Sequence, residues 1–183
     1  MIINCEIVKK IQAHDRKVIL ELYKQTFNVL MSAAVQYKNN REDQMHIVNT
    51  SFLKIVTGIH HYKIGTAYFS WAKKIVSNTI IDDFRKNKNY KALFEVDSII
   101  EDHGMEDESE IDNDIDKEAL QKILDTLPPA TKLVFSLFAL EEYSTKEISK
   151  DLDISYETVK WHIKEARKRL RKLVHRSKKI VEQ

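Results

Sequence analysis

The sequence predicts an all-α protein made of two small helical domains joined by an acidic, flexible linker. Apolar residues recur with a helical period over several long segments, which is the main sequence signal for amphipathic helices. The 183 residues include only 3 Gly and 2 Pro, so little of the turn chemistry that connects β-strands is present. A strongly acidic stretch near the middle of the chain divides these helical patterns into two groups.

The charges of the chain are segregated along the sequence. Residues 1–94 contain 15 Lys and Arg against 7 Asp and Glu, and residues 119–183 contain 14 against 9. Between them, residues 95–118 contain 12 acids and one Lys. The net charge of +2 therefore conceals two basic blocks that flank an acidic tether. This order is typical of a two-domain protein that binds nucleic acid.

Three amphipathic helices are predicted in the first domain, which we place at residues 15–94. They cover about 15–38, 42–60 and 66–88, and together they can bury one compact core. The inward-facing residues are Leu22, Phe27, Leu30, Met31 and Ala34 in the first helix, Val48, Phe52, Ile55, Val56 and Ile59 in the second, and Tyr68, Trp71, Ala72, Ile75 and Thr79 in the third.

The segment 95–116 is predicted to be the linker. It is acidic and poor in aromatic residues, so it cannot bury enough surface to offset the entropy of ordering it. The second domain, 117–176, begins with a helical stripe over 119–127 that Pro128-Pro129 terminates. A further helix is predicted around Leu133–Leu140.

Residues 144–173 predict two short helices joined by a tight turn. Ser144 and Glu147 have the spacing of a capping box that begins the first helix. Asp153 occupies the turn, where it tolerates a left-handed backbone better than most residues, and Ser155 can cap the second helix. This is the pattern of a helix-turn-helix.

The second of these helices carries two stripes. An apolar stripe is predicted to pack inward. A cationic stripe lies about 100° around the helix and suits a phosphate backbone. The alternative interpretation of the cationic stripe is a solvated helix face. The apolar residues are Val159, Ile163, Ala166 and Leu170, and the cationic residues are Lys160, Lys164, Arg167 and Arg171. The turn and the cap that precede this helix favour nucleic-acid binding.

Two stretches resemble the sigma-70 family of RNA polymerase sigma factors. LPPATKLVFSLFALEEYSTKEISKDLDISYETVKWHIKEARKRLRKL is similar to region 4 of that family, and FSWAKKIVSNTIIDDFRKNK is similar to region 2. The resemblance covers about 160 of the 183 residues. Two such regions with only a linker between them resemble the extracytoplasmic-function (ECF) group. A protein of this group binds core RNA polymerase, directs promoter-specific initiation at −10 and −35 elements, and assists strand separation without catalysing a covalent step.

The resemblance implies which residues contact promoter DNA. The second helix of the helix-turn-helix would read the duplex −35 element through Ser155, Tyr156, Glu157, Thr158, Lys160, Trp161, Lys164, Arg167, Lys168 and Arg171. Region 2 would hold the single-stranded −10 element, with an extruded base near a loop containing Asn78, through Lys73, Lys74, Asn78, Thr79, Asp82, Arg85, Lys86 and Lys88. Stacking on Tyr68, Phe69 or Trp71 is an alternative to a structural role, which we favour for Trp71.

The resemblance also places the polymerase-binding surface on the second predicted helix. Its residues would be Glu42, Asp43, His46, Asn49, Thr50 and Phe52. His46 and Thr50 stand where the family usually has acids that meet arginines of the core polymerase. An anti-sigma factor is a further partner that the family implies.

Other classes of protein fit the sequence less well. A free-standing helix-turn-helix regulator of the LuxR type would have an upstream β/α receiver, and no alternating pattern of that kind is present. We expect no enzymatic activity, cofactor or metal site, since no metal-ligand spacing appears and His60 and His61 are expected to point apart. No membrane insertion is expected, and the single Cys5, near an expected frayed terminus, indicates a reducing cytoplasm.

Overall fold

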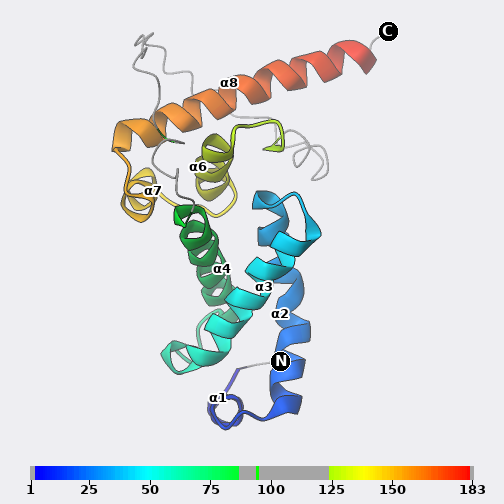
Figure 1. Ribbon diagram of the computed structural model, residues 1–183, viewed down its shortest axis with the longest axis vertical. Coiled ribbons are helices and arrows are strands. Elements are labelled where there is room, and N and C mark those ends of the chain that lie inside the picture. Colours follow the sequence, from blue (N-terminus) through cyan, green and yellow to red (C-terminus); the bar gives the residue numbers. More distant parts are fainter. Residues whose placement is uncertain (1–2, 87–93, 95–123, 182–183) are drawn as a thin grey trace. The chain divides into compact units, whose positions relative to one another are not determined.

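The computed structural model describes residues 3–86, 94 and 124–181, with side chains described as far as Lys172. These residues belong to two compact units, one within Met1–Lys86 and the other within Asn87–Gln183. All the regular structure in the described residues is helical, which confirms the predicted all-α class (Figure 1). The predicted linker 95–116, most of the predicted helix 119–127 and Lys88 lie outside the described residues.

The first unit is built from four α-helices and one short 3-10 helix. These are α1 (Cys5–Gln12), α2 (Arg16–Tyr37), α3 (Arg41–Thr57), η1 (Ile59–His61) and α4 (Tyr68–Arg85). The three long helices pack against one another, as the sequence predicts (Figure 1). Helix α1 was not predicted, and Cys5 is its first residue rather than part of a frayed end.

Local capping explains where these helices begin. The carboxylate of Asp15 accepts from the backbone N–H groups of Lys17 and Val18 at the start of α2. The Asn40 amide oxygen accepts from the N–H of Asp43 at the start of α3. Asp and Asn are favoured N-caps because they satisfy donors that have no partner within the helix.

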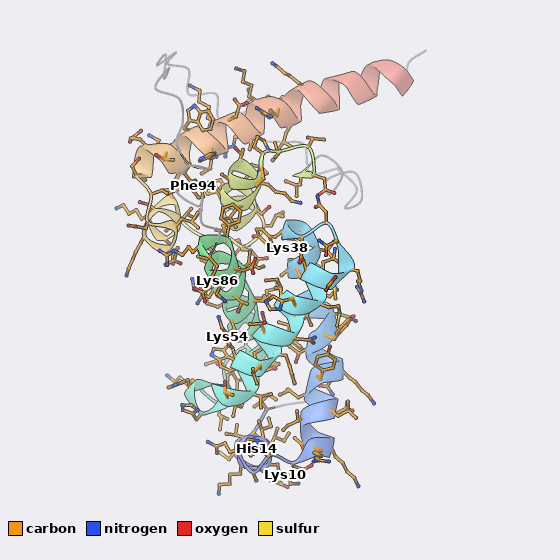
Figure 2. All side chains as sticks on the ribbon, in the orientation of Figure 1. Lys10, His14, Lys38, Lys54, Lys86 and Phe94 are labelled. Carbon is orange, nitrogen blue, oxygen red and sulfur yellow. The ribbon has the colours of Figure 1, made fainter. Side chains whose placement is uncertain are left out.

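The core of the first unit lies between α2, α3 and α4. Its fully buried side chains include Leu22, Leu30, Ile47, Val48, Ile55, Ala72 and Val76. The buried Thr26 hydroxyl on α2 donates to the Leu22 carbonyl and lies 3.0 Å from the Tyr68 hydroxyl of α4. Two ion pairs add contacts at the surface, Lys38–Asp83 at 2.6 Å and Lys54–Asp82 at 2.8 Å. Figure 2 labels both lysines.

The second unit contains α6 (Pro129–Ala139), α7 (Thr145–Leu152) and α8 (Tyr156–Val181). Helix α8 packs on both α6 and α7 (Figure 1). One buried cluster joins the residues just before α6 to α6 and α8 through Leu124, Leu127, Phe135, Ala166 and Leu170. The predicted apolar stripe of α8 is confirmed as its inner face, whereas α6 is buried along most of its length.

The predicted helix-turn-helix is also confirmed in its details. The Ser144 hydroxyl accepts from the N–H of Glu147, and the Glu147 carboxylate accepts from the N–H of Ser144. Asp153 adopts the left-handed conformation, with φ of 49°. Ser155 then caps α8, because its hydroxyl accepts from the N–H of Thr158 at 3.0 Å.

Loss of the capping box should destabilise the second unit. We expect Ser144→Ala to lower the free energy of unfolding by about 1 kcal/mol, since the donor at Glu147 loses its acceptor. Urea titrations followed by circular dichroism measure this change. The control is Thr145→Ala, which removes a hydroxyl from the neighbouring residue without removing the cap; equal losses in both variants would contradict the assignment.

Candidate nucleic-acid interface

Helix α8 separates its apolar and cationic residues onto two faces. Val159, Ile163, Ala166 and Leu170 are buried against the unit. Lys160, Lys164 and Lys168 are exposed, as are Tyr156 and Glu157 at the first turn. The lysines therefore present a row of positive charge on a helix whose opposite face is fixed by packing. Such a row suits a phosphate backbone or the edge of a base.

The remaining residues predicted on this interface are less exposed. Trp161, Arg167 and Arg171 are half-buried, and Thr158 is half-buried beside Ser155, with the two hydroxyl oxygens 2.7 Å apart. The Arg167 guanidinium lies 5.7 Å from the centre of the Phe138 ring on α6. The Lys160 ammonium lies 5.4 Å from the centre of the Tyr156 ring. Aromatic neighbours of this kind hold cationic side chains in place.

His162 is a buried residue of α8 that the sequence reading did not identify. Its side chain is 3% exposed, and its Nδ1 lies 2.9 Å from the Thr131 hydroxyl of α6. Burial disfavours the charged imidazolium and lowers the pKa of His162 to about 4, although the Glu165 carboxylate partly opposes this shift. Its position three residues after Val159 was the available signal, because that spacing lies on the inner face.

The second unit should become less stable as the pH is lowered, because His162 is buried in its neutral form. An unfolded histidine has a pKa near 6.5, so between pH 6.5 and 4 the unfolded chain takes up the proton before the folded chain does. The free energy of unfolding should therefore be unaffected by His162 above that range and lower by about 2 kcal/mol at pH 4.5.

Urea titrations at pH 7 and pH 4.5 measure this loss. His162→Gln keeps a neutral amide at the same place and cannot titrate, so the fall caused by His162 should disappear and only the part caused by the carboxylates should remain. A fall of the same size in both proteins would contradict the assignment.

Helix α4 carries residues predicted to hold single-stranded DNA. The structure places two of them, Asn78 and Thr79, differently from the prediction. Asn78 is exposed in the middle of a continuous helix rather than near a loop, since Tyr68–Arg85 is helical throughout. Thr79 is only 3% exposed and its hydroxyl donates to the Ile75 carbonyl. The helix turns the Thr79 side chain toward the core, so it is not exposed for the contact with DNA that the sequence predicts. Lys73, Lys74, Arg85 and Lys86 are exposed.

A groove of about 450 Å³ lies between α3 and α4. It brings together residues predicted for two different partners. Its walls are His46, Ile47, Thr50 and Lys54 from α3, and Thr79, Asp82, Asp83, Arg85 and Lys86 from α4. The ion pair between Lys54 and Asp82 crosses between these two walls. Residues proposed for polymerase binding and for DNA binding therefore share one surface.

The outer face of α3 holds the residues predicted to bind the polymerase. Glu42, Asp43, His46 and Asn49 are exposed, whereas Thr50 and Phe52 are half-buried. The Phe52 ring packs edge-on against Tyr23 of α2, with centroids 4.9 Å apart, and the Tyr23 hydroxyl lies 3.3 Å from the Asn49 amide oxygen. These contacts hold the α3 face in a defined position against α2.

Leu53 is the most exposed large apolar side chain of the described residues and was missed in the sequence reading. It is 62% exposed on the same face of α3 as Asn49, and Leu20 on α2 is 54% exposed. The available signal was that Leu53 lies outside the inward stripe of its helix.

Metal binding and membrane insertion have no counterpart in the described residues. No group of three or more His, Cys, Asp or Glu side chains there could hold a metal ion. The expectation that His60 and His61 point apart is wrong, because their rings lie 3.9 Å apart in the 3-10 helix η1. Within the same described part of the chain, no helix combines the length and the hydropathy of a membrane span.

Comparison with known proteins gives two family matches that together cover more than half of the chain. Residues 22–90 match the model described as Sigma-70 region 2, and residues 117–170 match the model described as Sigma-70, region 4. The chain is 25% identical over 178 residues to the ECF RNA polymerase sigma factor SigW of Bacillus subtilis, covering 90% of this chain and 93% of the relative. It is 29% identical over 138 residues to the RNA polymerase sigma factor SigV of the same species, covering 75% and 80%.

A solved structure shares the fold. The sigma factor RpoE in complex with the anti-sigma factor NepR from Bartonella quintana aligns with a TM-score of 0.51 and 17% identity. The alignment covers 85% of this chain and 95% of that one. At this identity the likeness concerns the fold alone.

Proposed function

The chain belongs to the ECF group of the sigma-70 family of RNA polymerase sigma factors. On this basis we propose which of its surfaces contact the −35 element, the −10 element and core polymerase. It binds core RNA polymerase and directs initiation at promoters that have −10 and −35 elements. The assignment of individual residues to these contacts is our proposal. The observation that carries it is the exposed lysine row of α8, opposite a buried apolar stripe.

In this proposal, the first half of α8 reads the −35 duplex. Tyr156, Glu157, Lys160 and Lys164 lie on the exposed side of the first turns, where a recognition helix meets base edges. Lysine can donate to guanine, and a carboxylate can accept from the cytosine amino group. Lys168 and Arg171 lie further along the helix and would contact phosphates, which position the helix without reading sequence.

The exposed side of α4 is proposed to hold the separated −10 strand. Asn78 offers a donor and an acceptor to the edge of an extruded base, and Lys73, Lys74, Arg85 and Lys86 supply positive charge for its phosphates. Tyr68 and Trp71 are given structural roles, since Tyr68 lies against Thr26 and Trp71 packs on Tyr62 with ring centroids 5.4 Å apart. Binding bases more tightly as single strand than as duplex would favour strand separation.

Core polymerase is proposed to dock on the outer face of α3. Glu42, His46, Asn49 and Leu53 are exposed there, and Phe52 supports the face from below. The Asp43 carboxylate accepts from the Asn40 side-chain amide at 2.7 Å, so it also helps to cap the helix. Leu53 supplies apolar contact area on a face where His46 and Thr50 replace the acids usual in the family.

We further propose that the protein works in the cytoplasm as a non-catalytic subunit. An anti-sigma factor would bind it before polymerase does and cover the same basic and apolar faces. The solved relative bound to an anti-sigma factor supports the existence of such partners within this fold. A free-standing LuxR-like regulator is not favoured, because both matched regions are those of sigma factors.

Run-off transcription with core polymerase from the native host tests this proposal. We expect specific initiation on a subset of promoter fragments that share paired upstream elements, and none without the protein. Asn78→Ala should reduce it, whereas Gln12→Ala, which removes an exposed side chain of α1 outside the proposed surfaces, should not. Tight binding to duplex DNA without any binding to core polymerase would overturn the proposal.

A further inference from the structure

Phe94 is buried in the second unit although it closely follows the first unit in sequence. Its side chain is 6% exposed, and its ring packs edge-on against His162 of α8, with centroids 5.5 Å apart and ring planes at 89°. Figure 2 labels its position. The sequence analysis assigned residue 94 to the first domain, so this contact joins the end of that segment to the helix proposed to read DNA.

Phe94 packs beside a buried pair of polar side chains, Thr131 and His162. The Thr131 hydroxyl has the Nδ1 atom of His162 as its partner at 2.9 Å, and donation to Nδ1 leaves the imidazole proton on Nε2. Nε2 is buried and has no hydrogen-bond partner among the residues that the structure describes. An aromatic ring is a weak acceptor for such an N–H group, and perpendicular rings at this separation are a preferred arrangement.

We propose that Phe94 is an intrachain anchor, which docks the segment that follows α4 on the His162 side of α8 and so shortens the connection between α4 and the helices of the second unit. Phenylalanine suits this role because it removes a large apolar surface from water when it docks. It also packs on an imidazole whose Nε2 has no hydrogen-bond partner among the described residues. Neither the helix-turn-helix nor the proposed DNA-reading residues of α8 require this contact.

The anchor limits how far apart the two units can move. Seven residues separate Lys86, at the end of α4, from Phe94, and eight Cα–Cα steps reach at most about 28 Å. Without the anchor, 38 Cα–Cα steps separate Lys86 from Leu124, so the chain sets a limit that is several times longer. Elements named −10 and −35 are nominally 25 base pairs apart, which is about 85 Å of duplex. The anchor would therefore restrict how far apart two promoter elements can be when both units bind them. This consequence rests on the proposed function, whereas the anchor itself does not.

Distance measurements on the free, full-length protein test the anchor. Spin labels on the native Cys5 and on Lys150→Cys, both exposed, report the separation of the two units by double electron–electron resonance. We expect Phe94→Ala to add a population at longer distances that is absent when Phe94 is present. Phe94→Leu should fall between the two, because it retains an apolar side chain. The control is Phe69→Ala, which removes an exposed ring from the first unit and should leave the distances unchanged.

Histidine resonances in the same proteins give an independent readout. Loss of the Phe94 ring should hydrate the imidazole, so that the NMR titration midpoint of His162 moves up toward its ordinary value. Thermal unfolding establishes that each variant is folded before either measurement. Distance distributions and His162 titrations that are the same with and without Phe94 would overturn the anchor. Since neither experiment contains polymerase or DNA, a failure of the proposed function is detected separately by transcription.

Discussion

Replacing both Lys160 and Lys164 by Glu is expected to reduce initiation at −35-dependent promoters by at least about 100-fold. The two ammonium groups are exposed one turn apart on the outer face of α8. A good contact to a base contributes about 1–3 kcal/mol of discrimination. The loss of two such contacts, together with the repulsion between the new carboxylates and the phosphates, is expected to lower binding by more than about 100-fold. Run-off transcription and binding of the holoenzyme to labelled promoter fragments measure the loss.

Two comparisons make this prediction specific. Lys9→Glu combined with Lys17→Glu changes the net charge equally on exposed positions of the first unit and should leave initiation nearly unchanged. Affinity for core polymerase should be the same in both double variants. If the control pair reduces initiation as strongly, the effect is one of net charge, and the assignment of α8 to the −35 element is wrong.

The single variants distinguish a base contact from a phosphate contact. We expect Lys164→Ala to relax the sequence preference at one position of the −35 element, because the first turns of a recognition helix meet base edges. Lys168→Ala, one turn further along α8, should weaken binding about equally for all sequences and reduce its dependence on salt. The same uniform loss for Lys164→Ala would make it a phosphate contact.

Leu53→Asp is expected to have the largest effect on polymerase binding. Leu53 is 62% exposed on the α3 face, and burying such a side chain against a partner contributes about 1.5–3 kcal/mol. Placing a carboxylate in that contact adds a desolvation cost, so affinity for core should fall by about 100-fold or more. Fluorescence anisotropy of protein labelled at the exposed Cys5 measures the dissociation constant.

The matched control for Leu53 is Ile64→Asp, an equally apolar residue that is 43% exposed outside α3. This variant should bind core with little change in affinity. The stability of the Leu53→Asp protein should also change little, because the side chain is in water in the free protein. Core binding that survives Leu53→Asp would remove α3 from the interface.

The salt dependence of core binding provides a second test of the same face. Charge pairs weaken as ionic strength rises, whereas apolar contacts do not. His46 and Thr50 stand where the family usually has acids, so we expect core binding to fall only weakly with salt. Restoring acids with His46→Glu and Thr50→Glu should raise the affinity at low salt and steepen its salt dependence.

The sequence by itself determined the three long helices of the first unit, the helix-turn-helix and the caps at Ser144 and Ser155. These features depend on neighbours within one or two turns: the period of apolar residues, the Ser144–Glu147 capping box and the left-handed turn at Asp153. The family assignment has the same local origin, because it rests on residues at fixed spacing in two contiguous segments. Helix α1 was not predicted, because its eight residues give a weak periodic signal and, unlike those of α7, follow no capping-box motif.

Only the tertiary structure decided which side chains face a partner and which face the core. Thr79 and His162 are polar residues of exposed-looking helices, and both are buried by the helices packed beside them. Leu53 is apolar and yet exposed, since no helix of the first unit covers that side of α3. Phe94 packs on His162, a residue 68 positions later in the chain. Burial depends on which helices meet, and contacts between segments far apart in sequence leave no periodic trace in either one.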